Sequence, residues 1–193
     1  MLKLAKLYEE QLNKKLAENV AKPENKFYSF SYIVTKLNID DNFWDAVQFV
    51  SVDKNDEVVG LFSARYERPE NYIGSISCFN FKKPSILFSK DLLDFLNYLV
   101  KVLNVPKIRW TVIIGNPIEK SYDNLCNKFG GRIVGIEKYH TLINGKYYDT
   151  KIYEWINDYY ECSSCSYKQK KEEEIICKEC GVGKMIYHNP FIY

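Results

Sequence analysis

Four cysteines near the C-terminus form the clearest chemical motif of the sequence. They make two pairs with two residues inside each pair, Cys162 with Cys165 and Cys177 with Cys180. Four thiolates at this spacing make a tetrahedral site suited to zinc, with sulfur about 2.3 Å from the metal. Gly181 follows the second pair, where a tight turn needs a residue that tolerates a positive φ. The spacing predicts a zinc ribbon; two disulfides or a redox Cys-x-x-Cys are the alternatives.

The predicted metal site indicates a structural role. A zinc ion bound by four cysteines has no open coordination position for water or substrate. Residues 157–193 are too few to fold on a hydrophobic core alone, whereas metal binding contributes roughly 10–16 kcal/mol in small zinc peptides. We therefore expect a separate zinc-ribbon module at 157–193 that stabilises or docks, and any chemistry in residues 1–156.

Composition excludes several classes of function. The chain has 193 residues, of which 46% are hydrophobic, enough for one ordinary domain and a small appendage. The net charge is only +2, and the C-terminal segment has five lysines against six Asp and Glu, so a nucleic-acid partner is not expected. A signal peptide and an apolar run of membrane-spanning length, roughly 20 residues, are both missing. With reduced cysteines, this predicts a cytoplasmic protein with no membrane partner.

Apolar periodicity predicts a helix before a strand-rich segment. Leu2, Ala5, Tyr8, Leu12 and Leu16 recur every three or four residues, which predicts an amphipathic helix over 2–20 within an N-terminal segment 1–22. Runs of aromatic and β-branched residues predict the strands that follow. The expected strands are 27–37, 46–52, 57–66 and 72–81, with a short helix at 40–45.

Two further helices and a hairpin are expected in the second half of the chain. Ser89 is the expected N-cap of a helix with a leucine stripe, which ends before Val105-Pro106. Asn144-Gly145 is a strong two-residue hairpin signal. The remaining expected elements are a strand at 107–114, a helix at 118–129 and hairpin strands at 132–143 and 146–156.

The order of these elements resembles the GNAT family of N-acetyltransferases, over roughly residues 27–156. The best match is 107–156, where a strand, the Asn116-Pro117 turn, a helix, Gly130-Gly131 and a closing hairpin follow one another. The resemblance implies an α+β fold, with a mixed, mostly antiparallel sheet flanked by helices, over residues 1–156. It also implies transfer of an acetyl group from acetyl-CoA to a primary amine.

The resemblance also implies where acetyl-CoA would bind. In the family, the fourth and fifth strands separate around the pantetheine arm, and the pyrophosphate rests on amides at the start of the next helix. Here these strands are 72–81 and 107–114. The family's phosphate turn carries two glycines, but Leu87 and Ser89 occupy the matching positions, after Pro84. The implied contact residues are Phe79, Phe81, Lys83, Ser85, Ile86, Leu87, Phe88, Ser89 and Asn116.

The implied catalytic groups lie outside this turn. Family members often use a tyrosine on the last helix to protonate the leaving thiolate. Counting back from Gly130 gives Cys126 at this position, and Tyr122, one turn earlier on the same face, is the preferred acid. Glu67 is the candidate base. The alternative is that Tyr122 and Cys126 are core residues and Glu67 a solvated charge.

Two functions follow from this sequence. The first is an N-acetyltransferase acting on a protein amine, with the zinc ribbon docking onto the protein partner. The second is a non-catalytic binding or structural protein, because GNAT-like folds without the glycine turn occur among phage and virion proteins. A cysteine nucleophile is a weaker third option. It would require Cys78 or Cys126 to meet His140 or His188.

Overall fold

The chain forms two compact units, Met1–Trp155 and Ile156–Tyr193. The structure is a computed structural model. The residues that it describes are 1–28, 36–37, 39–40, 43–82, 85–156, 159–165, 168–169, 179–181, 183 and 185–188.

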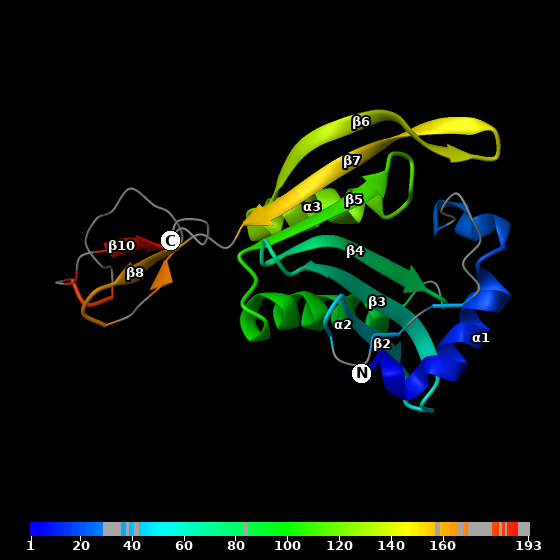
Figure 1. Ribbon diagram of the computed structural model, residues 1–193, viewed down its shortest axis with the longest axis horizontal. Helices are drawn as coiled ribbons and strands as arrows, with labels where there is room; N and C mark the ends of the chain where they lie inside the picture. The colour runs from blue at the N-terminus through cyan, green and yellow to red at the C-terminus, as the bar shows by residue number, and fades with distance from the viewer. Residues whose placement is uncertain are drawn as a thin grey trace. The chain divides into compact units, whose positions relative to one another are not determined.

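The first unit is built on a seven-stranded sheet in the order β1-β2-β3-β4-β5-β7-β6 (Figure 1). Neighbours are antiparallel from β1 to β4 and between β6 and β7, whereas β4 and β5 are parallel. This is the mixed, mostly antiparallel sheet expected from the sequence. The strands are β1 (Leu2–Leu4), β2 (Ala46–Val52), β3 (Val58–Glu67), β4 (Tyr72–Asn80), β5 (Lys107–Ile113), β6 (Arg132–Ile143) and β7 (Lys146–Ile156).

Helices cover both faces of this sheet. Helix α1 (Glu9–Asn19) buries Leu12 and Leu16 on one face, called here the α1 face, against a cluster that includes Leu61 and Phe79. Helix α2 (Ile86–Asn97), which continues as a π-helical turn (Tyr98–Val102), and helix α3 (Glu119–Phe129) cover the opposite face. We call this second side the α2/α3 face. Because side chains alternate along a strand, β2, β3 and β4 contribute to both cores.

The N-terminal segment differs from the expected helix over 2–20. Leu2–Leu4 form β1, which pairs with β2, and the 3₁₀ turn Ala5–Tyr8 precedes α1. The edge of β2 offers backbone hydrogen bonds that helical periodicity cannot reveal, so the first residues extend the sheet. The expected strand at 27–37 is also wrong at its start, because Pro23–Tyr28 form a 3₁₀ helix. Residues 29–35 lie outside the described residues, and 43–45 are bends rather than a helix.

The second helix begins earlier than expected. Ser85, not Ser89, is the N-cap of α2, and its side chain accepts a hydrogen bond from the Phe88 amide at 3.1 Å. Ser89 lies within the first turn. The later boundaries agree with the sequence: α3 ends at Gly130, with φ 74°, and the β6–β7 hairpin turns at Asn144 and Gly145, with φ 49° and 76°.

Strand β6 is a long but irregular edge strand. Its register with β7 shifts between Ile133 and Gly135 and again between Glu137 and Thr141. At the second shift Tyr139 has φ 51°, and its N–H donates to Asp149 Oδ1 at 3.0 Å. Large apolar side chains remain exposed along this edge. They are Ile133, Val134, Ile136, Tyr139 and Leu142.

The second unit contains a three-stranded sheet in the order β10-β8-β9. The strands are β8 (Tyr159–Cys162), β9 (Lys168–Gln169) and β10 (Met185–His188), with antiparallel pairing on both sides of β8. Among the described residues of the whole chain, no helix has the length and apolar character needed to span a membrane.

Candidate active site

Strands β4 and β5 pair at one point and then diverge. Their register is aligned at Ile73 and Ile108, near the start of both strands. Figure 1 shows the two strands separating beyond this point. Backbone N–H and C=O groups need hydrogen-bond partners, so the facing edges of β4 and β5 beyond Ile73 and Ile108 are suited to bind a ligand.

A β-bulge lies at the same place on β4. Arg65 is opposite Ser75 and Tyr66 is opposite Ile73, which leaves Gly74 as the extra residue. The Glu67 side chain lies over this glycine: a Cβ added at Gly74 would be 2.6 Å from Glu67 Oε1. The bulge therefore holds a carboxylate next to the point of divergence, on the α1 face. Bulges of this kind often redirect side chains beside active sites.

Tyr122 approaches from the opposite face. Its ring packs in T-shaped geometry on Trp110 of β5, with centroids 6.4 Å apart, and on Tyr153 of β7, at 6.1 Å. Its hydroxyl hydrogen-bonds the thiol of Cys78 on β4. Burial raises the pKa of Cys78 to about 12, and the Tyr122 hydroxyl acts in the opposite direction. Tyr122 therefore extends from α3 past β5 to β4.

Cys126, the other candidate acid, lies in the core one turn along α3. It is 4% exposed, and a Cβ added at Gly131 would be 2.6 Å from its sulfur. Burial, and to a smaller degree Asp123, raises the pKa of this thiol. Among the described residues, the nitrogens of His140 contact other groups, at 3.0 Å from Thr150 Oγ1 and 3.6 Å from Glu137 Oε2.

An ionic cluster that the sequence did not reveal holds α3 against β7. Lys151 Nζ lies 2.6 Å from Glu119 and 3.1 Å from Asp123, and the Tyr153 hydroxyl donates to Asp123 at 2.7 Å. The pKa of Glu119 is lowered, first by the Gly115 N–H and then by Lys151. Because Glu119 and Asp123 flank Tyr122 on the helix, this cluster fixes the position of the tyrosine.

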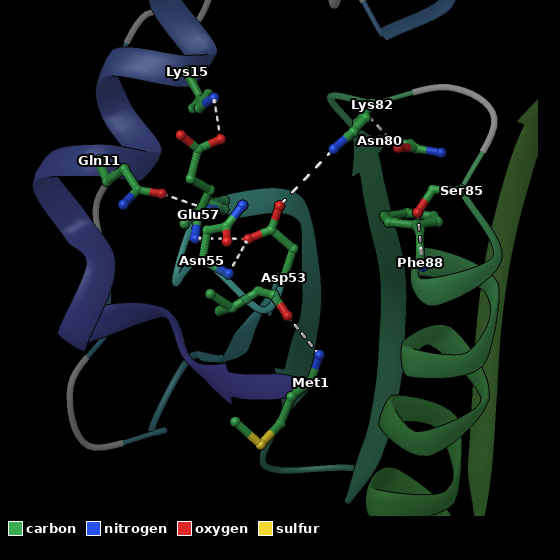
Figure 2. Close-up of polar contacts among 12 residues, drawn as sticks. Met1, Gln11, Lys15, Asp53, Asn55, Glu57, Asn80, Lys82, Ser85 and Phe88 are labelled. Atoms are coloured by element: carbon green, nitrogen blue, oxygen red, sulfur yellow. Dashed lines mark hydrogen bonds and ion pairs between the residues drawn. The ribbon is translucent and has the colours of Figure 1, made fainter.

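Figure 2 shows the start of α2. Ser85 faces the Phe88 amide, and the Phe88 ring lies against Phe62 of β3, with centroids 4.7 Å apart. The ring therefore covers β3 rather than the point where β4 and β5 diverge. Ile86 is 92% exposed and Leu87 is half-buried. The amides of Ile86 and Leu87 lie at the positive end of the helix dipole, a favourable place for an anion.

Other residues implied in acetyl-CoA binding lie at separate places. Phe79 and Phe81 stack at 4.8 Å in the core of the α1 face. Asn116 lies in the turn before α3, where its Oδ1 accepts the Ile118 N–H at 3.2 Å. Lys83 lies outside the described residues.

Lys82, which precedes the start of α2, contacts residues outside the helix. Its N–H donates to Asn80 Oδ1 at 3.0 Å, and its Nζ lies 3.9 Å from Asp53 Oδ2 in the β2–β3 turn (Figure 2). Its side chain is 70% exposed, so this contact with Asp53 is weak.

The four predicted metal ligands are only partly described. Cys165 is exposed and Cys180 half-buried, while Cys177 and the side chain of Cys162 lie outside the described residues. Among the described residues, no group of three His, Cys, Asp or Glu side chains could hold a metal. Two features nevertheless fit a metal-binding turn. Gly181 has φ 66°, and the Gly183 N–H donates to Cys180 Sγ at 3.3 Å.

Comparison with solved structures identifies the architecture. A probable acetyltransferase matches 81% of this chain and 92% of its own, with 12% identity and a TM-score of 0.59. Spermidine N-acetyltransferase from Vibrio cholerae, in complex with CoA and spermine, matches 81% and 94%, with 18% identity and a TM-score of 0.60. The fold is that of the GNAT acetyltransferases.

Solved structures share this fold, although comparisons of the sequence with protein families and curated proteins find no match. A third solved structure, spermidine/spermine N-acetyltransferase from Vibrio cholerae with manganese ions, covers 81% of this chain at 17% identity and a TM-score of 0.56. At such low identity the likeness establishes the GNAT fold alone.

Proposed function

We propose that the first unit transfers an acetyl group from acetyl-CoA to a primary amine. The observation that carries this proposal is the pair of groups at the β4–β5 divergence, Tyr122 on one face and Glu67 on the other. Amine acetylation needs a proton acceptor at the attacking nitrogen and a proton donor at the departing sulfur. The two residues are of the right types and approach from the two sides that these roles require.

Backbone groups would hold acetyl-CoA. The facing edges of β4 and β5 beyond Ile73 and Ile108 would hydrogen-bond the pantetheine arm. The amides of Ile86 and Leu87 would receive the pyrophosphate. Ser85 keeps the Phe88 amide occupied, so the helix presents these two amides at its end. Asn116 lies at the end of β5, where its side-chain nitrogen could meet the arm.

The transfer step follows from this placement. Glu67 takes a proton from the amine, and the nitrogen attacks the thioester carbon to form a C–N bond. Backbone N–H groups at the bulge stabilise the oxyanion of the tetrahedral intermediate. The C–S bond then breaks, and Tyr122 gives its proton to the leaving thiolate. Cys78, hydrogen-bonded to Tyr122, marks where a sulfur atom can meet the hydroxyl.

Calorimetric titration with acetyl-CoA tests the proposal. The wild-type protein should bind, and Leu87→Glu should abolish binding, because a carboxylate at the start of α2 repels the phosphates. Leu93→Glu is the matched control, since Leu93 is 41% exposed on the same helix but away from its start. No binding at millimolar acetyl-CoA would contradict the transferase.

For the second unit we propose a structural zinc ion bound by Cys162, Cys165, Cys177 and Cys180. The thiolate ligands suit zinc, and the Gly183 N–H donating to Cys180 Sγ is a contact that would stabilise a ligating sulfur. One zinc ion per chain is expected by metal analysis, and Cys180→Ser should reduce it. A metal-free chain with two disulfides would refute the site.

The acceptor is proposed to be a protein amine, with the second unit as the docking module. This rests on the division of the chain into two units, since a small-molecule acetyltransferase does not need an appended module. Deleting 157–193 should then raise the KM for a protein acceptor more than for a small amine. Equal effects on both acceptors would contradict docking.

A non-catalytic binding or structural role, as in a phage particle, is the second candidate. It is favoured by the absence of glycine between Lys82 and Ser89, where GNAT enzymes usually have two. The acetyl-CoA titration separates the two functions. A protein that has lost catalysis because its phosphate turn has lost the glycines should show no heat of acetyl-CoA binding.

A further inference from the structure

The α1 face of the sheet is polar where β4 and β5 diverge. Leu61 is opposite Phe79 in the core of this face, so the pairs Ser63–Ser77 and Arg65–Ser75 lie on the same face. Both Ser75 and Ser77 are exposed, unlike Phe79 further along β4. Apolar packing against α1 therefore gives way to small hydroxyl groups beside the divergence.

Strand β5 adds basic side chains to this polar surface. Lys107 lies over the ring of Tyr72, with its Nζ 5.7 Å from the centroid, and Tyr72 is opposite Glu67. Lys107 is thus on the α1 face, and alternation places Arg109 and Thr111 there too. Trp110, between them, faces the opposite core. Arg109 follows Ile108, the residue aligned with Ile73 at the divergence.

Positive charge exceeds negative charge on this surface. Glu67 pairs with Arg65 at 3.1 Å. Glu154, which is 9% exposed, contacts both Lys107 at 2.5 Å and Arg132 at 2.6 Å. Within the described part of the chain, Arg109 has no ion pair, although it is half-buried. A half-buried guanidinium without a carboxylate partner is a ready site for an anion.

We propose that Arg109 binds an anionic group of the acceptor, so that the preferred acceptor is an amine with a carboxylate or phosphate close to its nitrogen. The inference rests on the proposed transferase function and specifies its substrate class. A guanidinium can hold either anion through two parallel hydrogen bonds. With the anion on Arg109, the amine lies beside the divergence, within reach of Glu67 over Gly74.

The same charges disfavour a polyamine. A polycation would meet Arg65, Arg109 and Lys107, while Glu67 and Glu154 are already held by basic side chains. Like charges across a binding surface reduce affinity and exclude the wrong partner. The chain therefore shares its fold with spermidine acetyltransferases but presents a surface of unsuitable charge for spermidine.

Binding measurements without acetyl-CoA test the inference separately from the transferase. The probes for calorimetry are a glutamate-rich peptide with a free N-terminal amine, its glutamine counterpart, O-phosphoethanolamine, ethanolamine and spermidine. At least one anionic probe should bind about tenfold or more tightly than its neutral counterpart. Which of the two binds tells whether the acceptor is a peptide or a small phosphate ester.

Arg109→Gln should remove this preference, and Arg109→Lys should retain only part of it, because lysine keeps the charge but loses the paired hydrogen bonds. Lys101→Gln, an exposed charge on the π-helical turn, is the control and should change nothing. Tighter binding of spermidine than of every anionic probe, or an unchanged preference in both Arg109 variants, would overturn the inference. Failure of the acetyl-CoA titration alone would contradict the transferase and leave the anion site standing.

Discussion

Tyr122 and Glu67 approach one point of the sheet from opposite sides. The helical repeat is enough to place Tyr122 on the inner face of α3 from the sequence. The sequence does not show that its hydroxyl meets Cys78, because residues on different elements meet only after the sheet forms. Glu67 was proposed from the sequence as the candidate base, but its position beside the divergence could not be predicted, since it depends on the bulge at Gly74.

Removing the Tyr122 hydroxyl should lower kcat. Tyr122→Phe keeps the ring contacts with Trp110 and Tyr153 but removes the proton donor, so we expect a fall of about 10²-fold in kcat with little change in acetyl-CoA affinity. Steady-state kinetics at saturating acetyl-CoA measures this. Tyr139→Phe, at an exposed position on β6, is the control. An unchanged kcat in Tyr122→Phe would assign the tyrosine to packing.

The thiol of Cys78 should react slowly with alkylating reagents in the native protein. Because burial raises its pKa to about 12, the reactive thiolate is scarce at neutral pH. Its labelling by iodoacetamide should rise about tenfold per pH unit through pH 7–10 without levelling. Peptide mass spectrometry follows the site, with Cys78→Ser to assign it. A plateau of the labelling near pH 8–9 would indicate an activated cysteine and would support the alternative of a cysteine nucleophile.

The start of α2 depends on a contact that is distant in sequence. Both Ser85 and Ser89 are suitable caps by residue type. The choice of Ser85 brings Phe88 into the first turn, where its ring packs over Gly60 on β3. A side chain at position 60 would occupy the space of this ring. Local capping signals could not distinguish the serines, because the deciding contact lies on another strand.

Gly60→Ala should therefore destabilise the first unit. The added Cβ would lie 2.2 Å from the Phe88 ring, so α2 or the ring must shift, at a cost of about 1–3 kcal/mol in the free energy of unfolding. Gly135→Ala on β6 is the matched control, since its nearest neighbour would be Ile152 Cδ1 at 4.0 Å. Urea denaturation compares them. Equal stabilities of the two variants would show that the Phe88 ring moves aside at no cost, which would contradict this prediction.

For the chain as a whole, the sequence predicted the architecture better than the chemistry. The β6–β7 hairpin and α3 were predicted because Asn144-Gly145 and Gly130 are local signals. The short strand β1 was missed because its only support is its pairing with β2. The predicted zinc ligands and acetyl-CoA contacts remain predictions. The role proposed for Arg109 could not be predicted from the sequence, because it depends on which face of β5 this residue occupies.

The stability of the first unit should fall in acid through Glu154, which joins β5, β6 and β7. Burial alone would raise its pKa, but Lys107 and Arg132 outweigh burial and lower it. A lowered folded-state pKa means that this stabilisation is present above the unfolded pKa and is lost as the pH falls through the folded value. Glu154→Gln should cost about 3 kcal/mol at neutral pH.

This loss should shrink as the pH falls below the unfolded-state pKa and through the lowered folded-state pKa, where wild-type Glu154 becomes protonated as well. Urea denaturation of both proteins across the pH range measures it. Glu137→Gln, at a 43% exposed carboxylate on β6, is the control. A difference between Glu154→Gln and wild type that is independent of pH would mean that the ion pairs do not stabilise the fold.

The two register shifts in β6 carry a consequence for behaviour at high concentration. A smooth outer strand rich in isoleucine and leucine would be a template on which further chains could stack into fibrils. Here the distorted backbone at Val134 and Tyr139 interrupts the row of donors and acceptors that an incoming chain would need. The protein can thus expose apolar side chains on this outer strand and still resist polymerisation into fibrils.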